Sequence, residues 1–163
     1  MFYHSPVGII QIKISNNYIS ELIYVDDKRE TQSEKIKLAV SEIDLLKKCV
    51  TQFDDYFSGK RKTFDLPIQQ SGTAFQQKVW NELIRIPFGK TISYLQLAQK
   101  LGDAKSIRAA ASANGRNKLN IIVPCHRVIG SDGKLVGYGG GLPRKKWLLE
   151  HEAKFENGVS LLF

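Results

Sequence analysis

Apolar and polar residues alternate along residues 7–25, and one polar stretch interrupts the alternation. Apolar side chains recur on both sides of Ser15-Asn16-Asn17, where the chain is polar for three residues. A period of two is typical of β-strands, and a short Asn-containing break is typical of a tight turn. The pattern therefore predicts a β-hairpin.

Residues 33–57 change to a helical spacing of apolar side chains, and this spacing predicts a long helix. Gly59 and the basic run 60–62 end it, and a short strand is expected near Phe64–Ile68. Residues 1–70 are therefore expected to form a small α+β domain. They carry no catalytic motif, so we interpret this domain as a scaffold. The apolar positions of the helix are Ile36, Leu38, Ala39, Ile43, Leu46, Val50, Phe53 and Phe57.

The second half of the chain predicts mostly helices, and the first begins at residue 73. Thr73 and Gln76 are spaced as a capping box ahead of an apolar run. Pro87-Phe88-Gly89 is expected to break this helix. The fold class is therefore α+β, with a hairpin-plus-helix domain at residues 1–70 and a mostly helical domain at residues 71–163.

Two short helices are predicted next, at residues 93–98 and 106–113, with Gly102 in the turn between them. A helix, a glycine-containing turn and a second helix are typical of a helix-turn-helix. The second helix carries Arg108 among small side chains. Small residues let a helix approach the narrow minor groove of DNA, where an arginine can enter the groove or the base stack. The same composition also fits a helix packed tightly in a core.

The charge is distributed unevenly between the two halves. The chain has 42% hydrophobic and 25% charged residues, as is ordinary for a globular protein, and a net charge of +8. Residues 1–84 carry 11 basic and 11 acidic side chains, whereas residues 85–163 carry 13 and 5. This asymmetry indicates a polyanionic partner for the second half. A solubility bias in a small basic protein would give the same count.

The two cysteines, Cys49 and Cys125, are too few for a disulfide framework, and no CxxC pair is present. A reducing compartment, cytoplasm or nucleoid, is therefore expected. Residues 1–13 do not resemble a signal peptide, and no apolar run is long enough to span a membrane. The scattered histidines and cysteines predict no metal site, and no nucleotide-binding motif predicts a cofactor. Cys49 is expected to be buried and inert.

Cys125 lies in a different setting, since Pro124 precedes it and His126 and Arg127 follow it. A free thiol has a pKa near 8.5, so a neighbouring base and a positive charge would activate it. The apolar run at residues 121–123 predicts a β-like approach to the cysteine. Neighbours in an extended chain point to opposite sides. His126 would therefore reach the sulfur only through a water or through a turn after Cys125.

The run Pro124-Cys125-His126-Arg127-Val128-Ile129-Gly130 resembles the active-site signature of the methylated-DNA–protein-cysteine methyltransferases, also called O6-alkylguanine-DNA alkyltransferases. The resemblance covers residues 72–152 in order and leaves the first half matched only in general character. Its other elements are residues 72–80, Ile92-Ser93-Tyr94 with Leu97-Ala98, Arg108-Ala109, Asn114, Asn117, Gly137-Tyr138 and residues 147–152.

The resemblance implies the role of each residue at the reaction centre. Cys125 would attack the alkyl carbon on guanine O6 and keep it permanently. His126 would act as a base through a bridging water, and Glu152 would orient it. Asn117 would brace the turn before the cysteine. Tyr94 would help to rotate the nucleotide and donate a proton to the departing guanine ring.

The resemblance also implies how DNA is bound. The partner would be double-stranded DNA, approached from the minor groove, with the alkylated guanine flipped out because O6 is unreachable in the stack. Arg108 would fill the gap, and the backbone carbonyls of Cys125 and Val128 would accept from the guanine amino group. The expected DNA contacts are Ser93, Tyr94, Arg108, Ala109 and Ser112, and the expected pocket residues are Val128, Tyr138, Gly139 and Gly140.

The predicted function is thus single-use repair of O6-alkylguanine by a monomer, with alkylthymine lesions as a second candidate substrate. Two positions depart from the family pattern. Lys118 stands where many members have proline, which would loosen the hinge and add a charge near DNA. Gly139 stands where some members have serine, which would widen the pocket toward bulkier alkyl groups.

Three other readings of the same residues stay open. A cysteine hydrolase would turn over, but such enzymes usually place the base far from the nucleophile in sequence. A non-catalytic module for alkylated DNA would lack the cysteine, which is present here. A transcription regulator would need a dimer interface or an added domain, and neither is visible in the sequence.

Overall fold

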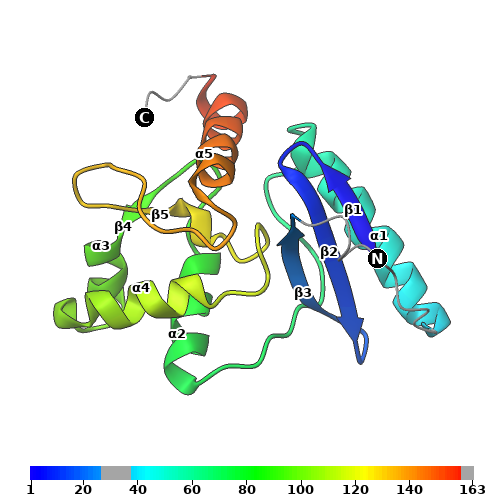
Figure 1. The fold of residues 1–163 in the computed structure, drawn as a ribbon, viewed down its shortest axis with the longest axis horizontal. Coiled ribbons are helices and arrows are strands. Elements are labelled where there is room, and N and C mark those ends of the chain that lie inside the picture. Colours follow the sequence, from blue (N-terminus) through cyan, green and yellow to red (C-terminus); the bar gives the residue numbers. More distant parts are fainter. Residues whose placement is uncertain (27–37, 159–163) are drawn as a thin grey trace. The chain divides into compact units, whose positions relative to one another are not determined.

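The computed structural model describes residues 1–26 and 38–158 (Figure 1). The chain divides into two compact units, Met1–Gln70 and Ser71–Phe163. The first holds a three-stranded sheet with one long helix, and the second is mostly helical, so the α+β prediction is confirmed. No helix in the described ranges is long and apolar enough to cross a membrane.

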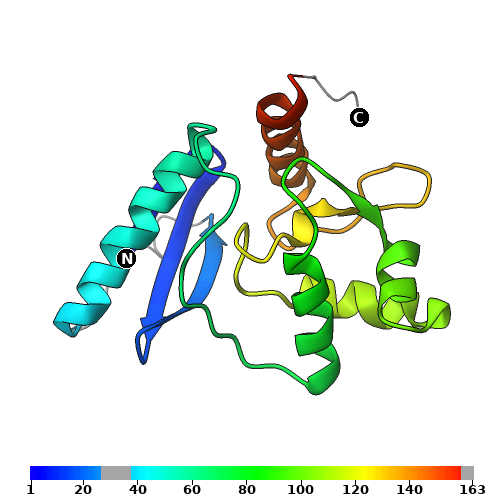
Figure 2. The same cartoon turned by 180° about the vertical axis from the view of Figure 1, so that it is seen from behind.

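The sheet of the first unit is an antiparallel meander of β1 (Phe2–Ser5), β2 (Gly8–Ser15) and β3 (Tyr18–Val25) (Figures 1 and 2). The predicted hairpin is confirmed as β2 and β3. Its turn residues Asn16 and Asn17 have φ angles of 52° and 62°. Two-residue hairpin turns favour this left-handed conformation, which asparagine tolerates better than most residues. Strand β1 was not predicted.

The helix of the first unit, α1, runs over Val40–Phe57. It begins later than the predicted residue 33, and residues 33–37 of that prediction lie outside the described residues. The Glu42 carboxylate accepts from the Ala39 backbone N–H at 3.0 Å, which satisfies a donor at the helix start. The predicted end is confirmed, because Gly59 follows the helix with a φ of 77°.

Aromatic side chains join α1 to the sheet in the core of this unit. The Phe53 ring lies 5.5 Å from the Tyr3 ring of β1 and 5.3 Å from the Phe64 ring, measured between centroids. Cys49 is fully buried in the same core. Figure 2 shows α1 lying along one face of the sheet.

The prediction of a short strand near residues 64–68 is wrong. Only one parallel bridge forms there, between Ile19 and Ile68. The Pro67 carbonyl accepts from the Ile19 N–H at 2.9 Å, but proline has no N–H of its own to extend a ladder.

The second unit begins with α2 (Ala74–Ile84), and its predicted capping box is confirmed. The Gln76 N–H donates to the Thr73 hydroxyl at 3.2 Å, and the Gln76 side chain accepts from the Thr73 N–H at 2.9 Å. The helix ends before Pro87-Phe88-Gly89, as predicted, and Gly89 has a φ of 70°.

The predicted pair of short helices is present as α3 (Tyr94–Lys100) and α4 (Ile107–Gly115). Ser93 caps α3 through its hydroxyl, and Gly102 takes a φ of 93° in the turn. A 3-10 turn, η2 (Ala104–Ser106), leads into α4. The arrangement is a helix, a tight turn and a second helix.

The prediction of a β-like segment before Cys125 is wrong. Residues 121 and 122 lie in a turn and residue 123 in a bend, and Ile121 has a φ of 75°. The Val123 N–H donates to the Leu119 carbonyl and the Cys125 N–H donates to the Val123 carbonyl, so these groups bond locally rather than to another strand. The apolar side chains of this run are therefore buried by turns that fold into the core.

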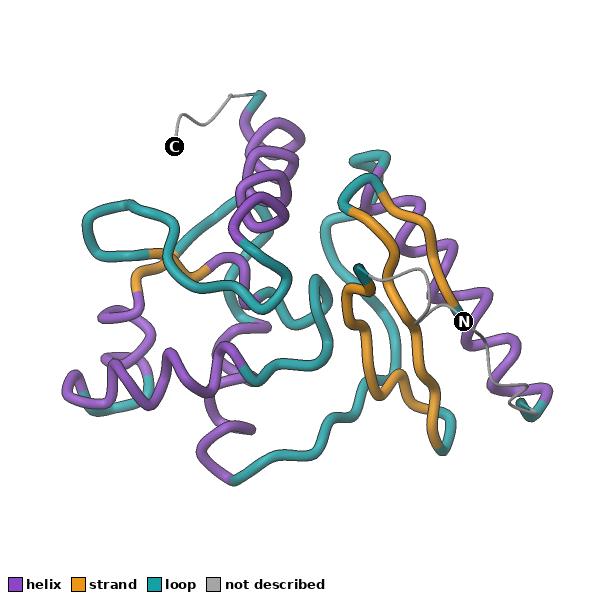
Figure 3. Tube along the Cα trace, in the orientation of Figure 1, coloured by secondary structure: helices purple, strands orange, loops and turns teal. Residues whose placement is uncertain are grey.

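Cys125 instead opens a 3-10 turn, η3 (Cys125–Arg127), which leads into β5 (Val128–Ile129). Strand β5 pairs in parallel with β4 (Ile92–Ser93) just ahead of α3. An irregular loop over residues 130–141 then leads to the final helix, α5 (Leu142–Asn157) (Figure 3). These elements surround the cysteine.

Candidate active site

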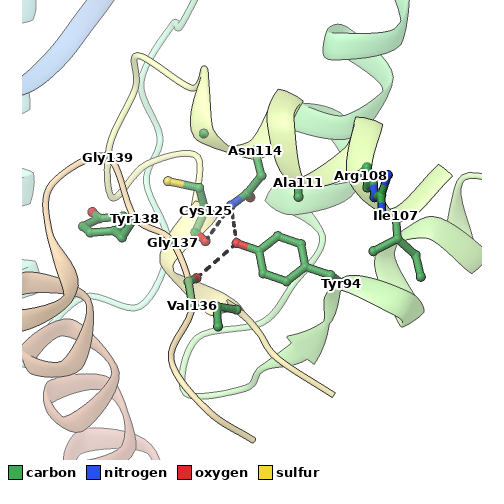
Figure 4. Close-up of a pocket in the computed structure, with 11 residues that line it drawn as sticks. Tyr94, Ile107, Arg108, Ala111, Asn114, Cys125, Val136, Gly137, Tyr138 and Gly139 are labelled. Atoms are coloured by element: carbon green, nitrogen blue, oxygen red, sulfur yellow. Dashed lines mark hydrogen bonds between the residues drawn. The ribbon is translucent and has the colours of Figure 1, made fainter. Parts of the chain in front are cut away.

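Cys125 lies at a pocket of about 340 Å³ in the second unit (Figure 4). Its side chain is only 4% exposed. Helix α4, the start of α3 and the loop before α5 provide the other walls. The lining residues are Tyr94, Ile107, Arg108, Ala111, Asn114, Gly115, Cys125, Val136, Gly137, Tyr138 and Gly139.

The sulfur of Cys125 has polar partners on the turn that precedes it. It accepts from Asn117 Nδ2 at 3.3 Å and donates to Asn120 Oδ1 at 3.9 Å. Burial raises the pKa of the Cys125 thiol, while the Asn117 amide, the positive charge of Lys145 and the backbone N–H groups of Cys125 and His126 act in the opposite direction. The resting group is thus a protonated thiol beside groups that would stabilise its anion.

Asn117 also holds the turn that carries the cysteine. Its Nδ2 donates to the Val123 carbonyl at 2.9 Å, and its Oδ1 accepts from the Leu119 N–H at 3.0 Å. The predicted brace residue therefore contacts both sides of the turn and the sulfur itself.

His126 and Glu152 form a fully buried pair, in which Nε2 lies 2.8 Å from Oε1. Burial lowers the pKa of His126, helped by the charges of Arg127 and Lys145 and opposed by Glu152. A neutral imidazole bonded to a carboxylate must place its proton on Nε2, because the carboxylate only accepts. Nδ1 is then an unprotonated acceptor, and it is buried without a hydrogen-bond partner among residues 1–26 and 38–158.

The prediction that Arg127 supplies a positive charge beside the thiol is wrong. Its guanidinium donates to Glu152 Oε2 at 2.8 Å, to Glu152 Oε1 at 2.9 Å and to the Ile86 carbonyl at 2.6 Å. The Gly89 N–H also donates to Glu152 Oε2, at 3.1 Å. His126 and Arg127 hold the pKa of Glu152 well below its usual range, despite burial. The 3-10 turn explains why Arg127 contacts Glu152 and not the thiol. Successive side chains of a tight turn point in other directions than those of an extended chain, on which the prediction was based.

Lys145 supplies the charge instead, and sequence reasoning missed it. This fully buried lysine donates to the Val128, Val136 and Gly137 carbonyls at 2.6, 2.8 and 3.1 Å. Burial lowers its pKa to about 8, and the charge of Cys125 partly offsets this. A signal was available, since Lys145 lies on the same buried face of α5 as Leu148 and Glu152.

Tyr94 lies at the opposite wall and is part of a chain of hydrogen bonds (Figure 4). Its hydroxyl donates to the Val136 carbonyl at 3.4 Å and accepts from Asn114 Nδ2 at 3.3 Å. The same Nδ2 reaches the Cys125 carbonyl at 3.4 Å. Burial and the charge of Cys125 raise the pKa of Tyr94, and the Asn114 bond opposes them. Sequence matching noted Asn114 without assigning it a role.

The predicted DNA contacts divide between the pocket and the surface. Arg108 is exposed at the pocket edge, and Ala109 and Ser112 are exposed on the same helix, α4. The Ser93 hydroxyl accepts from the Gln96 N–H at 3.1 Å as the cap of α3. Four further basic residues between positions 100 and 118 are exposed: Lys100, Lys105, Arg116 and Lys118.

The predicted pocket residues are only partly brought together. Tyr138 and Gly139 line the pocket, whereas Val128 and Gly140 are buried outside its lining. The Val128 carbonyl accepts from Lys145. The proposed acceptance of a guanine amino group by that carbonyl stays a prediction. Among the described residues, no group of three or more His, Cys, Asp or Glu could hold a metal ion.

Two family models match the chain. Residues 1–70 match the model described as 6-O-methylguanine DNA methyltransferase, ribonuclease-like domain. Residues 74–154 match the model described as 6-O-methylguanine DNA methyltransferase, DNA binding domain.

Similar proteins carry consistent names. A methylated-DNA–protein-cysteine methyltransferase of Methanosarcina mazei is 41% identical over 155 residues, which cover 93% of this chain and 97% of the relative. A constitutive one of Bacillus subtilis is 45% identical over 141 residues, or 83% of each chain. A Mycobacterium tuberculosis structure solved in complex with DNA aligns with a TM-score of 0.83 and 38% identity, covering 94% of this chain and 92% of that one. The chain therefore belongs to the 6-O-methylguanine DNA methyltransferase family, also named the methylated-DNA–protein-cysteine methyltransferases.

Proposed function

We propose that this protein repairs DNA by direct reversal, moving a methyl or larger alkyl group from guanine O6 to Cys125. The names of its relatives describe methylated DNA as the donor and a protein cysteine as the acceptor. One observation carries the assignment to this residue. Of the two cysteines, Cys125 lines a pocket next to a buried histidine–carboxylate pair, and Cys49 lies in the core of the first unit.

The reaction follows from the positions of the polar groups. The unprotonated Nδ1 of His126 takes the thiol proton through a water, and Glu152 stabilises the imidazolium that forms. The sulfur forms a bond to the alkyl carbon, the bond from that carbon to O6 breaks, and its electron pair goes to the guanine. Tyr94 donates its hydroxyl proton to the ring, and the phenolate recovers a proton from the imidazolium through solvent.

The product is a thioether, which neither water nor thiols reverse. Each molecule therefore acts once. We propose that it does so as a monomer and without a cofactor. A protonated resting thiol fits a single-use protein, because reaction with stray electrophiles would waste it. Burial of Cys125 provides that protection until a base is bound.

The lesion must leave the duplex before the sulfur can reach it. Unstacking and unpairing a base costs a few kcal/mol, and less for a damaged base. Arg108 at the pocket edge would occupy the space in the stack, and the small exposed residues Ala109 and Ser112 would let α4 approach the minor groove. The net charge of +8 supports binding to the phosphate backbone, so raising the salt should weaken it steeply.

The remaining proposals concern the size of the alkyl group, the kind of damaged base and the role of the first unit. An added Cβ at Gly139 would lie 3.9 Å from the nearest atom, the Gly115 carbonyl oxygen, so the glycine leaves room for larger alkyl groups. Alkylthymine is a second candidate substrate. Residues 1–26 and 38–70, the described part of the first unit, contain no cysteine beside a histidine–carboxylate pair, and we propose that this unit serves as a scaffold.

The test is intact-mass spectrometry after mixing the protein with a duplex that contains O6-methylguanine. We expect one added methylene unit per molecule and unmodified guanine in the DNA. Cys125→Ser should bind the duplex and gain no mass. Repair without a gain in protein mass would indicate hydrolysis, and binding without repair would indicate a non-catalytic module. Either result would overturn the proposal.

A further inference from the structure

One buried amide joins α4 to the Tyr94 side chain and to the backbone of Cys125. Asn114 lies near the end of α4 and is 3% exposed. Its Nδ2 donates to the Tyr94 hydroxyl oxygen at 3.3 Å and to the Cys125 carbonyl at 3.4 Å (Figure 4). Its Oδ1 is buried and has no hydrogen-bond partner in the part of the chain that the structure describes. Leaving a buried carbonyl without a hydrogen bond is unfavourable, so a contribution to stability does not explain this residue.

The Cys125 carbonyl determines which end of the amide faces the pocket. A carbonyl oxygen can only accept, so Asn114 must turn its NH₂ group toward it. The opposite rotamer would place two carbonyl oxygens against each other. The amide nitrogen therefore also faces Tyr94, and in this contact the phenol oxygen accepts.

The hydrogen bond that Asn114 donates to the Tyr94 oxygen determines where the phenol proton points. Because the Tyr94 oxygen already accepts from Asn114, its own proton must be directed elsewhere, and it is donated to the Val136 carbonyl at 3.4 Å. Val136 lines the pocket, so the proton points along the pocket wall. A bound base could take this proton in place of a long hydrogen bond.

We infer that Asn114 is a positioning residue that aims the Tyr94 hydroxyl proton at the substrate base. The inference rests on the proposed function, in which Tyr94 protonates the departing guanine. Donation from Asn114 also favours the phenolate, which works against the burial that raises the pKa of Tyr94. A more acidic phenol gives up its proton more readily as the leaving group develops negative charge.

Asn114→Leu tests this role, because it keeps the size and removes the donor. The expected result is a transfer rate from O6-methylguanine duplex about tenfold lower, the loss typical of one hydrogen bond. Methyl iodide forms the same thioether at Cys125, but iodide leaves without a proton. Peptide mapping should show that this second reaction changes by less than about twofold, since leaving-group protonation is not required. Asn81→Leu, at an exposed asparagine of α2, is the matched control and should change neither rate.

A double-mutant cycle with Tyr94→Phe separates action through the phenol from a structural effect. In the Tyr94→Phe background, Asn114→Leu should slow transfer by less than about twofold, because coupled residues are not additive. Equal slowing of both methyl donors, additive losses, or an unchanged rate would each overturn the inference. Failure of the parent protein to methylate itself from DNA would instead overturn the proposed function.

Discussion

The surroundings of the two cysteines differ more than their burial does. Cys49 is 0% exposed and Cys125 is 4% exposed, so solvent reaches neither thiol freely. Burial alone raises the pKa of Cys49 to about 12. At Cys125 an amide, a buried ammonium and two backbone N–H groups oppose the same effect. Burial protects both thiols, but among the described residues only Cys125 has partners that can stabilise a thiolate.

The difference arises from the local backbone. Cys49 lies in the middle of α1, where the backbone N–H groups are used by the helix itself. Cys125 opens a 3-10 turn, where the N–H groups of Cys125 and His126 favour its thiolate, although the Cys125 N–H also donates to the Val123 carbonyl. A reactive thiol thus needs a backbone that places donors near its sulfur, as well as a pocket for the substrate.

The largest expected effect comes from Glu152→Gln, which would disturb the pair that distinguishes the Cys125 region. Glutamine cannot neutralise the positive charge of the buried Arg127. Removing one partner of a buried ion pair lowers the free energy of unfolding by about 3–5 kcal/mol. Without the carboxylate, His126 is a weaker base, and the transfer rate should fall about 100-fold. Denaturant unfolding and single-turnover kinetics measure the two losses.

Glu150→Gln is the matched control for that variant. Glu150 is on the same helix, is 40% exposed and lies 3.9 Å from Lys146, so both quantities should stay near the parent values. A Glu152→Gln protein with full transfer activity would show that the pair is not required.

Lys145→Met should make Cys125 behave more like Cys49. The ammonium favours the thiolate, so its removal raises the pKa of Cys125, and alkylation by iodoacetamide at pH 7 should slow about tenfold. The pKa of Lys145 is lowered to about 8, so the parent loses this charge as the pH rises past that value. The ratio of parent to variant rates should therefore be largest below pH 8 and shrink above it.

Lys146→Met removes the neighbouring, half-exposed lysine and should leave the alkylation rate unchanged. If Lys145→Met and Lys146→Met gave the same pH profile as the parent, the charge of Lys145 would have no part in distinguishing the two thiols.

Gly139→Ser changes the pocket and leaves the sulfur and its partners in place. The added Cβ meets no close neighbour, so folding should be unaffected. The rate with O6-benzylguanine, relative to the methyl lesion, should fall roughly fivefold, as is usual for a small change in pocket volume. Competition between the two substrates measures this ratio. Faster benzyl transfer by the serine variant would contradict the idea that Gly139 widens the pocket.

Cys49→Ala should have the smallest effect on function. It removes a buried sulfur and is expected to lower the free energy of unfolding by about 1 kcal/mol, a typical value for a core substitution. The transfer rate and the mass gained on reaction should match the parent. A loss of transfer in a folded Cys49→Ala protein would assign Cys49 a role that its surroundings do not support.

Local signals predicted the elements that local physics controls. The Asn16-Asn17 turn and the Thr73 capping box are set by residues close in sequence, and both predictions are confirmed. The β4–β5 pair depends on contacts between segments that are distant in sequence. Strand β1 pairs with the adjacent β2, but its four residues are too few to show a clear period. The turns before Cys125 are held by local hydrogen bonds, and their apolar side chains imitate a strand. Pattern reading therefore missed the strands and mistook the buried turns for a strand.

The chemistry of the site shows the same division. Cys125 and His126 adjoin in sequence, and a known signature contains both. Lys145 and Asn114 act from other helices, and their contacts to Val128, Tyr94 and Cys125 exist only in the folded chain. Arg127 was predicted to act on the thiol because it is two residues away, and the 3-10 turn directs it to Glu152 instead.

The central claim is that Cys125 accepts one alkyl group per molecule. The most direct test titrates a fixed amount of protein with duplex carrying deuterated O6-methylguanine, then counts repaired lesions and maps the label by peptide mass spectrometry. The account predicts a plateau at one lesion per protein molecule, with all of the deuterium on the peptide that contains Cys125. Repair that continues past the amount of protein, or label on Cys49 or any other residue, would contradict it.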